Sequence, residues 1–220
     1  MNFAEPRAYW RYIQALGSAA IPRKSRRQEN IEATRAALTA VARRHFARKG
    51  YNETDIVDIA RDARLTTGAI YHHFKSKLAL FQAVAEELES EILAASSSVA
   101  VGDPWEALHV AFEKLVDLCA RPDVQRIIFI EAPQVIGPGA WREIEMRYAF
   151  GVMQATLASL RAANRIKPYS TEYIACTLLA LLRESSAEVA RNKGSAKARE
   201  QVSELASGVF NLLRTRRDKA

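Results

Sequence analysis

Apolar side chains recur along this chain at the three- and four-residue spacing of α-helices. Between residues 28 and 49 they include Ile31, Leu38, Val41 and Phe46. Gly50 then supplies a helix stop, because glycine adopts a left-handed backbone at little steric cost. No segment alternates apolar and polar residues for the length of a strand. The pattern therefore predicts an all-α fold.

Glycine, proline and helix-capping residues divide the rest of the chain into further helices. Asp55 and Thr66 are side chains of the type that caps helix starts. The expected helices cover residues 55–62, 66–73, 75–97, 104–119, 121–137, 140–164, 170–192 and 196–214. Residues 1–25 are expected to form an arm with a weak helix, leading into a basic run at 23–27 that either follows DNA or is a solvated linker.

The two short helices at 55–62 and 66–73 are separated by the tight turn of a helix-turn-helix. A recognition helix needs an apolar inner face, which Leu65, Ile70 and Phe74 provide, and a polar outer face that can reach base edges and phosphates. A structural helical hairpin with solvated histidines is the alternative. The candidate DNA contacts are Thr54, Arg64, Thr66, Thr67, Gly68, Ala69, Tyr71, His72, His73 and Lys77.

Charge is distributed unevenly, and this supports a nucleic-acid partner. Residues 1–80 hold 15 Lys and Arg against 7 Asp and Glu, whereas residues 81–220 hold 17 against 18. The formal net charge of +7 thus arises at the end that carries the helix-turn-helix. Basic groups that neutralise phosphates release counterions, so this end is suited to double-stranded DNA.

Other classes of site have little support. Cys119 and Cys176 stand apart from one another, and neither has the neighbours of a zinc site. Adjacent histidines on a helix point about 100° apart, which disfavours a metal at His72 and His73. No apolar run approaches the roughly 18 residues that span a bilayer. We expect a cytoplasmic protein with no metal, no cofactor and no enzymatic activity.

The stretch from Gly50 to Lys77, GYNETDIVDIARDARLTTGAIYHHFKSK, resembles the DNA-binding domain of TetR/AcrR-type transcriptional regulators. The resemblance rests on the Gly-Tyr pair, the Ile-Ala pair and the closing Gly-x-hydrophobic-Tyr-x-His-Phe-x-Ser-Lys pattern, all in register. It implies operator contacts at Tyr71, His72, His73 and Lys77. Two positions depart from the pattern: Arg64 replaces the usual turn glycine, at a cost of roughly 1 kcal/mol if the backbone is left-handed, and Thr67 replaces a frequent lysine.

The resemblance also implies a second helical domain that binds a partly apolar small-molecule effector and forms the homodimer. Most apolar positions on its helices are ordinary core, and Arg147 has Glu143 as an alternative partner on its own helix. The candidate effector residues are Leu88, Ile92, His109, Phe112, Leu115, Phe129, Glu131, Arg147, Tyr148 and Met153. The candidate dimer residues, on the last two helices, are Ile174, Leu178, Leu181, Leu182, Leu205, Val209, Leu212 and Leu213.

The predicted organisation is an arm at 1–25, a three-helix DNA-binding domain at 26–77, and a larger effector-binding and dimerisation domain at 78–220. The predicted function is a homodimeric repressor that a small-molecule effector releases from a palindromic operator. An α-helical small-molecule-binding protein or enzyme without DNA binding is the alternative. Loss of salt-dependent DNA binding on substitution of Tyr71 and Lys77 would separate the two.

Overall fold

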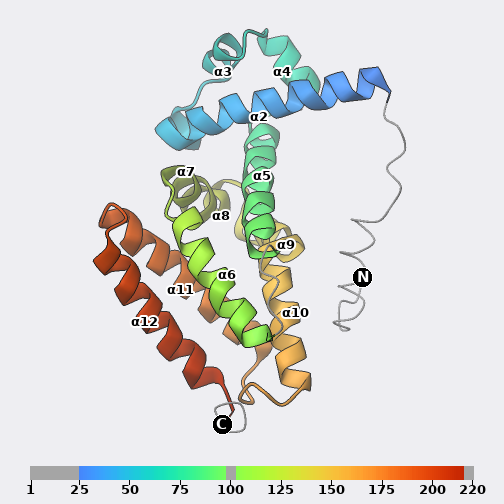
Figure 1. Cartoon of the computed structure of the whole chain (residues 1–220). Coiled ribbons are helices and arrows are strands. Elements are labelled where there is room, and N and C mark those ends of the chain that lie inside the picture. The colour runs from blue at the N-terminus through green and yellow to red at the C-terminus, as the bar shows by residue number, and fades with distance from the viewer. Residues whose placement is uncertain (1–24, 98–102, 216–220) are drawn as a thin grey trace. The chain divides into compact units, whose positions relative to one another are not determined.

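The computed structural model describes residues 25–97 and 103–215, and all regular elements within these ranges are helices (Figure 1). The predicted all-α fold is confirmed. An isolated backbone bridge joins Ile166 to Arg214. Apart from Ser25, the predicted N-terminal arm lies outside the described residues. In the described ranges, no helix is both long enough and apolar enough to cross a membrane.

The described residues fall into two compact units that are not contiguous in sequence. Residues 25–89 and 122–144 make one, here called the helix-turn-helix unit, and the rest make the other, here called the C-terminal unit. The predicted boundary at residue 77, between a DNA-binding and an effector-binding domain, divides the chain by function and stays a prediction. By packing, a segment from the middle of the predicted second domain groups with the helix-turn-helix.

Several short helices surround one long helix in the helix-turn-helix unit. The helices are α2 (Arg26–Glu53), α3 (Ile56–Asp62), α4 (Thr67–His73), the first half of α5 (Lys77–Ser97), α7 (Pro122–Val124), the π-helix η1 (Gln125–Glu131), α8 (Ala132–Val135) and most of α9 (Pro138–Arg147). In Figure 1, α3 and α4 lie on one side of α2, and α7 and α8 lie on the other. Helix α2 packs against α3 on one side and against α7 and η1 on the other.

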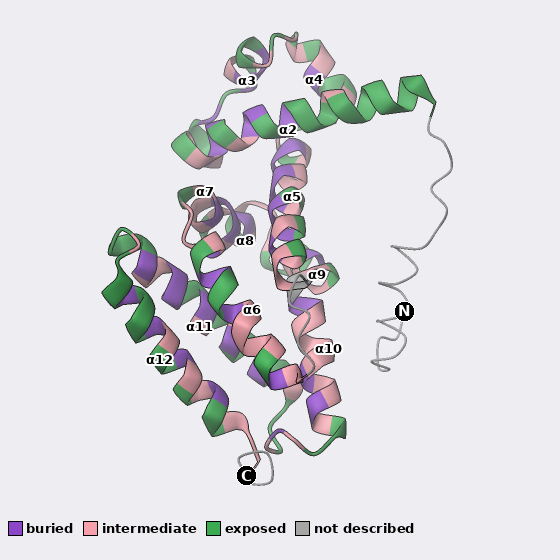
Figure 2. Ribbon diagram, viewed as in Figure 1, coloured by how far each residue is buried: buried purple, intermediate pink, exposed green. Residues whose placement is uncertain are grey.

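The core of this unit follows the apolar spacing in the sequence. Leu38, Ala42 and Phe46 of α2 are fully buried, whereas residues 25–33, at the start of the same helix, are exposed (Figure 2). The ring of Phe46 meets that of Phe81 edge to face, with centroids 5.1 Å apart. Burying such rings is a large hydrophobic contribution, and their edge-to-face geometry adds about 0.5–1.5 kcal/mol.

Helix α2 is interrupted at Gly50, as the sequence predicts, and then continues for one short turn. Gly50 has φ 80° and ψ 174°, a backbone conformation that residues with a Cβ rarely adopt. The Thr54 hydroxyl donates a hydrogen bond to the Gly50 carbonyl at 2.6 Å. The break thus turns the chain from α2 into α3, whose N-cap is Asp55.

Four helices form the C-terminal unit, together with the end of α5. These are α6 (Pro104–Cys119), α10 (Ala149–Ala162), α11 (Thr171–Arg191) and α12 (Ala196–Leu213), and α11 packs against the other three. Asp103 caps α6, and Pro104 occupies its first position, where the missing N–H is not needed. The Phe112 and Phe210 rings lie 5.5 Å apart and link α6 to α12.

Two of the predicted helices are wrong in detail. The helix expected at 121–137 is divided into α7, the π-helix η1 and α8. Pro133 explains part of this division, because it has no N–H to donate to the Phe129 carbonyl and its ring crowds that carbonyl. The helix expected at 140–164 breaks at Tyr148, with φ −118° and ψ −141°, although no glycine or proline lies between residues 140 and 150.

Candidate nucleic-acid interface

The helix-turn-helix is built by two capped helices and one left-handed residue. Asp55 caps α3 by accepting from the Val57 N–H at 2.9 Å, and Thr66 caps α4 by accepting from the Ala69 N–H at 3.1 Å. Between them, Arg64 has φ 56°, so the expected left-handed turn is present without a glycine. The Leu65 N–H donates to the Ala60 carbonyl at 2.9 Å and closes the end of α3.

Helix α4 has the two-faced character that a recognition helix needs. Ile70 and the C-cap residue Phe74 are 1% and 3% exposed and fix the helix to the core. On the opposite face, Tyr71 is 51% exposed and His72 is exposed beside it. The predicted outer face is therefore free of the unit's own core.

The start of α4 leaves room for a partner. Thr66 is exposed, and Thr67 and Ala69 are half-buried. Gly68 is exposed and helical, and a Cβ built there would meet only the Thr66 hydroxyl, at 3.8 Å. The fold itself therefore does not require glycine at this position.

The far end of α4 is held by a contact that the sequence analysis missed. The guanidinium of Arg35, from α2, donates to the His73 carbonyl and lies over the Phe74 ring, 4.2 Å from its centroid. A positive charge at a helix C-terminus is stabilising. Because Arg35 is 38 residues away from His73 in sequence, local periodicity carries no signal for this pairing.

Two of the predicted DNA contacts are engaged within the protein. Lys77 donates to the Asn52 carbonyl at 3.3 Å, and its ammonium lies 4.6 Å from the centroid of the Tyr51 ring. Thr54 is 2% exposed, and its hydroxyl is bonded to Gly50. Thr54 was therefore wrongly predicted as a DNA contact, since it is buried at the junction of α2 and α3.

Acidic side chains of α3 anchor the helix-turn-helix to α2. Asp58 accepts from Lys49 at 2.8 Å, and this hydrogen bond lowers the pKa of Asp58, as the nearby Arg61 also does. The His45 ring bonds Asp62 at 2.8 Å and lowers the pKa of that carboxyl. Both aspartates thus stay ionised at neutral pH and hold α3 in place.

Three polar links join α2 to the α7–η1 segment. Arg43 pairs with Asp123 at 2.6 Å. Arg126 donates to the carbonyls of Ala47 and Arg48 at 3.1 and 2.7 Å, and the Tyr51 N–H donates to Glu131 at 2.8 Å. Glu131, predicted as an effector residue, thus has a backbone partner in the helix that leads to the helix-turn-helix.

The other predicted effector residues are divided between the two units. Leu88 and Phe129 belong to the helix-turn-helix unit, whereas Ile92, Phe112, Leu115, Tyr148 and Met153 belong to the C-terminal unit. Arg147 is exposed, which contradicts its selection as a buried polar group awaiting a ligand. His109 lies 3.3 Å from the Ser207 hydroxyl and 3.5 Å from the Glu113 carboxylate, at the contact of α6 with α12.

The predicted dimer residues separate into core and surface. Ile174, Leu178 and Leu182 are 2%, 2% and 8% exposed, so they are core residues of their own subunit and not interface residues as predicted. In contrast, Leu205 and Leu212 are 61% and 63% exposed.

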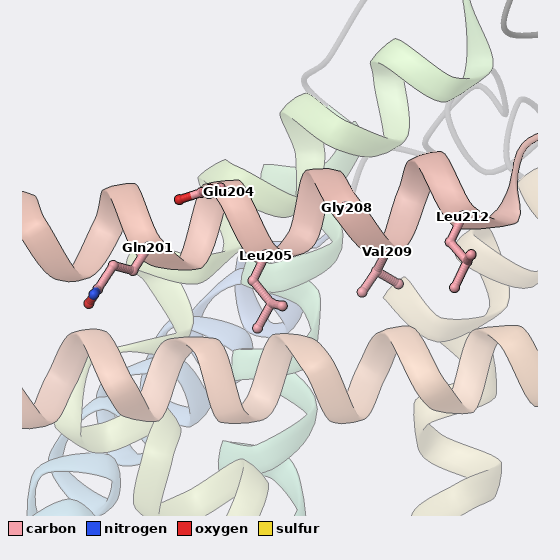
Figure 3. A pocket seen from close by; sticks show the side chains of 6 residues that line it. All are labelled: Gln201, Glu204, Leu205, Gly208, Val209 and Leu212. Atoms are coloured by element: carbon pink, nitrogen blue, oxygen red, sulfur yellow. The ribbon is translucent and has the colours of Figure 1, made fainter.

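An open groove of about 470 Å³ lies along α12. It is lined by Gln201, Glu204, Leu205, Gly208, Val209 and Leu212. Figure 3 shows Leu205, Val209 and Leu212 along one side of α12, on the side of a neighbouring helix. The predicted interface residues Leu181 and Leu213 are half-buried. An apolar strip therefore remains uncovered on α12 within a single chain.

Two family profiles match most of the described chain. The profile for bacterial regulatory proteins of the tetR family matches residues 38–84, which contain the helix-turn-helix. The profile for the tetracyclin repressor-like C-terminal domain matches residues 105–213. The two matches follow one another in the order expected for a DNA-binding domain and a larger helical domain.

Comparisons with individual proteins agree with the profiles. The Transposon Tn10 TetC protein of Escherichia coli is 30% identical over 69% of this chain and 77% of its own length. The HTH-type transcriptional repressor BepR of Brucella suis biovar 1 (strain 1330) is 28% identical over 68% of this chain and 75% of its own. A crystal structure of a TetR-family transcriptional regulator from Pectobacterium atrosepticum is 25% identical, with a TM-score of 0.65 over 88% of this chain and 99% of that one. The chain therefore belongs to the TetR family of helix-turn-helix transcriptional regulators.

Proposed function

We propose that this protein is a homodimeric repressor that binds a palindromic operator through the outer face of α4, and that a small, partly apolar effector releases it. The observation that carries the proposal is the arrangement of α4, with Ile70 buried and Tyr71 and His72 exposed on the other side. The protein acts by binding, without catalytic chemistry, and in the cytoplasm where the chromosome lies.

Each residue of the outer face has a distinct role in this proposal. The Tyr71 phenol and the His72 ring bond base edges or phosphate oxygens, and Ala69 meets a thymine methyl group. Thr66, Thr67 and the backbone at Gly68 approach phosphate at the start of α4. His73 and Lys77 add phosphate contacts at its end, and Arg64 adds one from the turn.

A second copy of the chain completes the DNA-binding form. The apolar strip of Leu205, Val209 and Leu212 supports an intersubunit contact through α12. A two-fold interface repeats the same strip on both subunits. It sets two recognition helices about 34–36 Å apart, one turn of DNA, which requires an inverted-repeat operator.

We propose that the effector binds among apolar side chains of the C-terminal unit. Ile92, Phe112 and Leu115 are buried, and Tyr148 and Met153 are half-buried. A partly apolar molecule with one or two polar groups fits such a lining. The effector then releases the operator because it binds the operator-competent conformation of the protein less tightly than the conformation that does not bind the operator. The roles of Leu88 and Phe129 stay predictions.

The proposal is tested by selecting duplexes from a random-sequence DNA pool with the full-length protein and measuring affinity for the selected duplex. We expect an inverted repeat and a loss of tenfold or more in the Tyr71→Ala variant. Tyr169→Ala is the matched control, because Tyr169 is also 51% exposed but lies on the loop before α11. Failure of the wild-type protein to enrich any sequence would overturn the proposed function.

A further inference from the structure

The break in α2 at Gly50 is capped on both sides by one segment of the chain. A helix that ends leaves carbonyls without partners, and a helix that starts leaves N–H groups without partners. Arg126 donates to the carbonyls of Ala47 and Arg48 before the break, and Glu131 accepts from the Tyr51 N–H after it. The charges match the ends: the cation is at the carbonyl end and the anion at the N–H end.

Glycine at position 50 makes room for this arrangement. A Cβ built on Gly50 would lie 2.4 Å from the Glu131 Oε1 atom, too close for two heavy atoms. The Glu131 side chain is 17% exposed, and its carboxylate also lies 3.6 Å from the Arg126 Nε atom. Arg126, Glu131 and the Gly50 break therefore form one compact polar contact, here called the Gly50 clamp.

The π-helical register of η1 aligns the two clamp residues. Arg126 and Glu131 are five positions apart, and in an α-helix of 3.6 residues per turn they would point about 140° away from each other. A π-helix bonds residue i to residue i+5, so such residues lie about one turn apart on the same face. The Ala132 N–H indeed bonds the Ile127 carbonyl, five residues back. Pro133 favours this register because it cannot complete the α-helical bond to Phe129.

The clamp is connected to the DNA-binding helices by short steps. The Thr54 hydroxyl ties the Gly50 carbonyl to the start of α3. The Tyr51 ring lies under the Lys77 ammonium and meets the Phe81 ring, with centroids 5.2 Å apart, at the start of α5. A displacement of Gly50 and Tyr51 would thus move both ends of the segment that carries α3 and α4.

We propose that Arg126 and Glu131 are positioning residues for operator binding, and that the π-helical register of Gln125–Glu131 is the two-state element that holds them in place. A change of this segment to α-helical register turns Arg126 and Glu131 apart, opens the Gly50 clamp and lowers operator affinity. This inference rests on the proposed operator binding and adds the residues that set its competence. π-helical segments are frequent at functional sites. In this one, the π-helical register brings Arg126 and Glu131 to the same face of the helix.

The first test breaks the clamp directly and uses the duplex selected by the wild-type protein. Glu131→Ala should lower operator affinity tenfold or more, and Glu131→Gln should lower it less, because the amide oxygen still accepts from the Tyr51 N–H. Gln134→Ala, an exposed position on the adjacent α8, should match the wild type. Dimer formation and low-salt binding to unrelated DNA should be unchanged in all three variants, because neither uses the clamp.

The second test changes the register without removing a clamp residue. Pro133→Ala permits the α-helical bond and should lower operator affinity. Deletion of Ile130, which is 55% exposed, shortens the spacing from Arg126 to Glu131 to four residues, and four residues align on one face of an α-helix. Pro133→Ala combined with this deletion should therefore recover affinity to within about threefold of the wild type.

The outcomes separate this inference from the proposed function. If the wild-type protein selects an operator but Glu131→Ala and Pro133→Ala bind it as tightly, the clamp has no positioning role. If Glu131→Ala does not fold, the test rests on Pro133→Ala and on Pro133→Ala combined with the deletion of Ile130, since both variants retain Arg126 and Glu131. Loss of affinity in Pro133→Ala with no recovery on deletion would overturn the register as the cause. Failure to select any operator would be a failure of the proposed function instead.

Discussion

The Nε2 atom of His45 lies 2.8 Å from the Oδ2 atom of Asp62, and this contact joins α2 to the last residue of α3. His45 is 4% exposed, so the imidazole is fixed by packing while Asp62 reaches it from the surface. The left-handed Arg64 follows two residues later. The pair thus anchors the chain just before the turn of the helix-turn-helix.

We expect the Asp62 contact to stabilise the protein only where the carboxyl is ionised. The hydrogen bond from His45 lowers the pKa of Asp62 from its usual value of 3.8. A lowered pKa means that this stability is fully present above the unfolded-state pKa of 3.8 and is lost as the pH falls from there through the folded-state pKa. Asp62→Ala should therefore melt below the wild type at pH 5–7, and the difference should close in strong acid. A constant difference in melting temperature down to pH 2 would contradict this, and Glu53→Ala, an exposed carboxylate on α2, serves as the charge-matched control.

Arg64→Gly should change stability and DNA affinity in opposite directions. Removing a non-glycine residue from φ 56° relieves about 1 kcal/mol of backbone strain, so the midpoint of urea unfolding should rise. If the exposed guanidinium contacts phosphate, the slope of log affinity against log salt should fall by about one per half-site. An unchanged salt slope would mean that Arg64 does not reach DNA.

Gly68→Ala tests whether DNA approaches the start of α4 closely. The added methyl group meets only the Thr66 hydroxyl, and alanine favours a helix over glycine by up to about 1 kcal/mol, so stability should hold or rise. Affinity for the selected operator should fall tenfold or more in a gel-shift titration. Gly139→Ala, at an exposed position of α9 with no atom within 4 Å of the added carbon, should likewise hold or raise stability but leave operator affinity unchanged.

Leu205→Asp combined with Leu212→Asp should disrupt the homodimer. Both leucines are more than 60% exposed in the single chain, and two aspartates facing their symmetry copies would place like charges in an apolar interface. Sedimentation velocity should show monomers at concentrations where the wild type is dimeric. Ile31→Asp, at a 40% exposed position of α2, should remain dimeric. A dimer that survives the double change would place the interface elsewhere.

Local sequence signals were enough to predict the helix-turn-helix closely. Helices expected at 55–62 and 66–73 are observed as Ile56–Asp62 and Thr67–His73, because Asp55, Thr66 and Gly50 act through their immediate neighbours. The inner and outer faces of α4 follow from helical periodicity alone. Local chemistry is therefore a sound guide where caps and turns decide the structure.

The features that were missed depend on partners far away in sequence. Nothing in the sequence around Glu131 predicts its partner. The partner is the N–H of Tyr51, which lies 80 residues earlier in the chain. Likewise, the exposed and buried leucines of α11 and α12 have the same sequence pattern, and only packing inside the subunit separates Leu178 from Leu205. The register of η1 is equally hidden, because its apolar residues fit an α-helix just as well.

The discontinuous packing of the helix-turn-helix unit has a consequence for building chimeric repressors. Domain exchange at residue 77 would transfer α2, α3 and α4 but would leave behind residues 122–144, which pack against α2. The graft would lack the partners of Arg43 and Tyr51, and the new sensor would have to replace them. Transplanting residues 25–89 together with residues 122–144 keeps all the described residues of the helix-turn-helix unit.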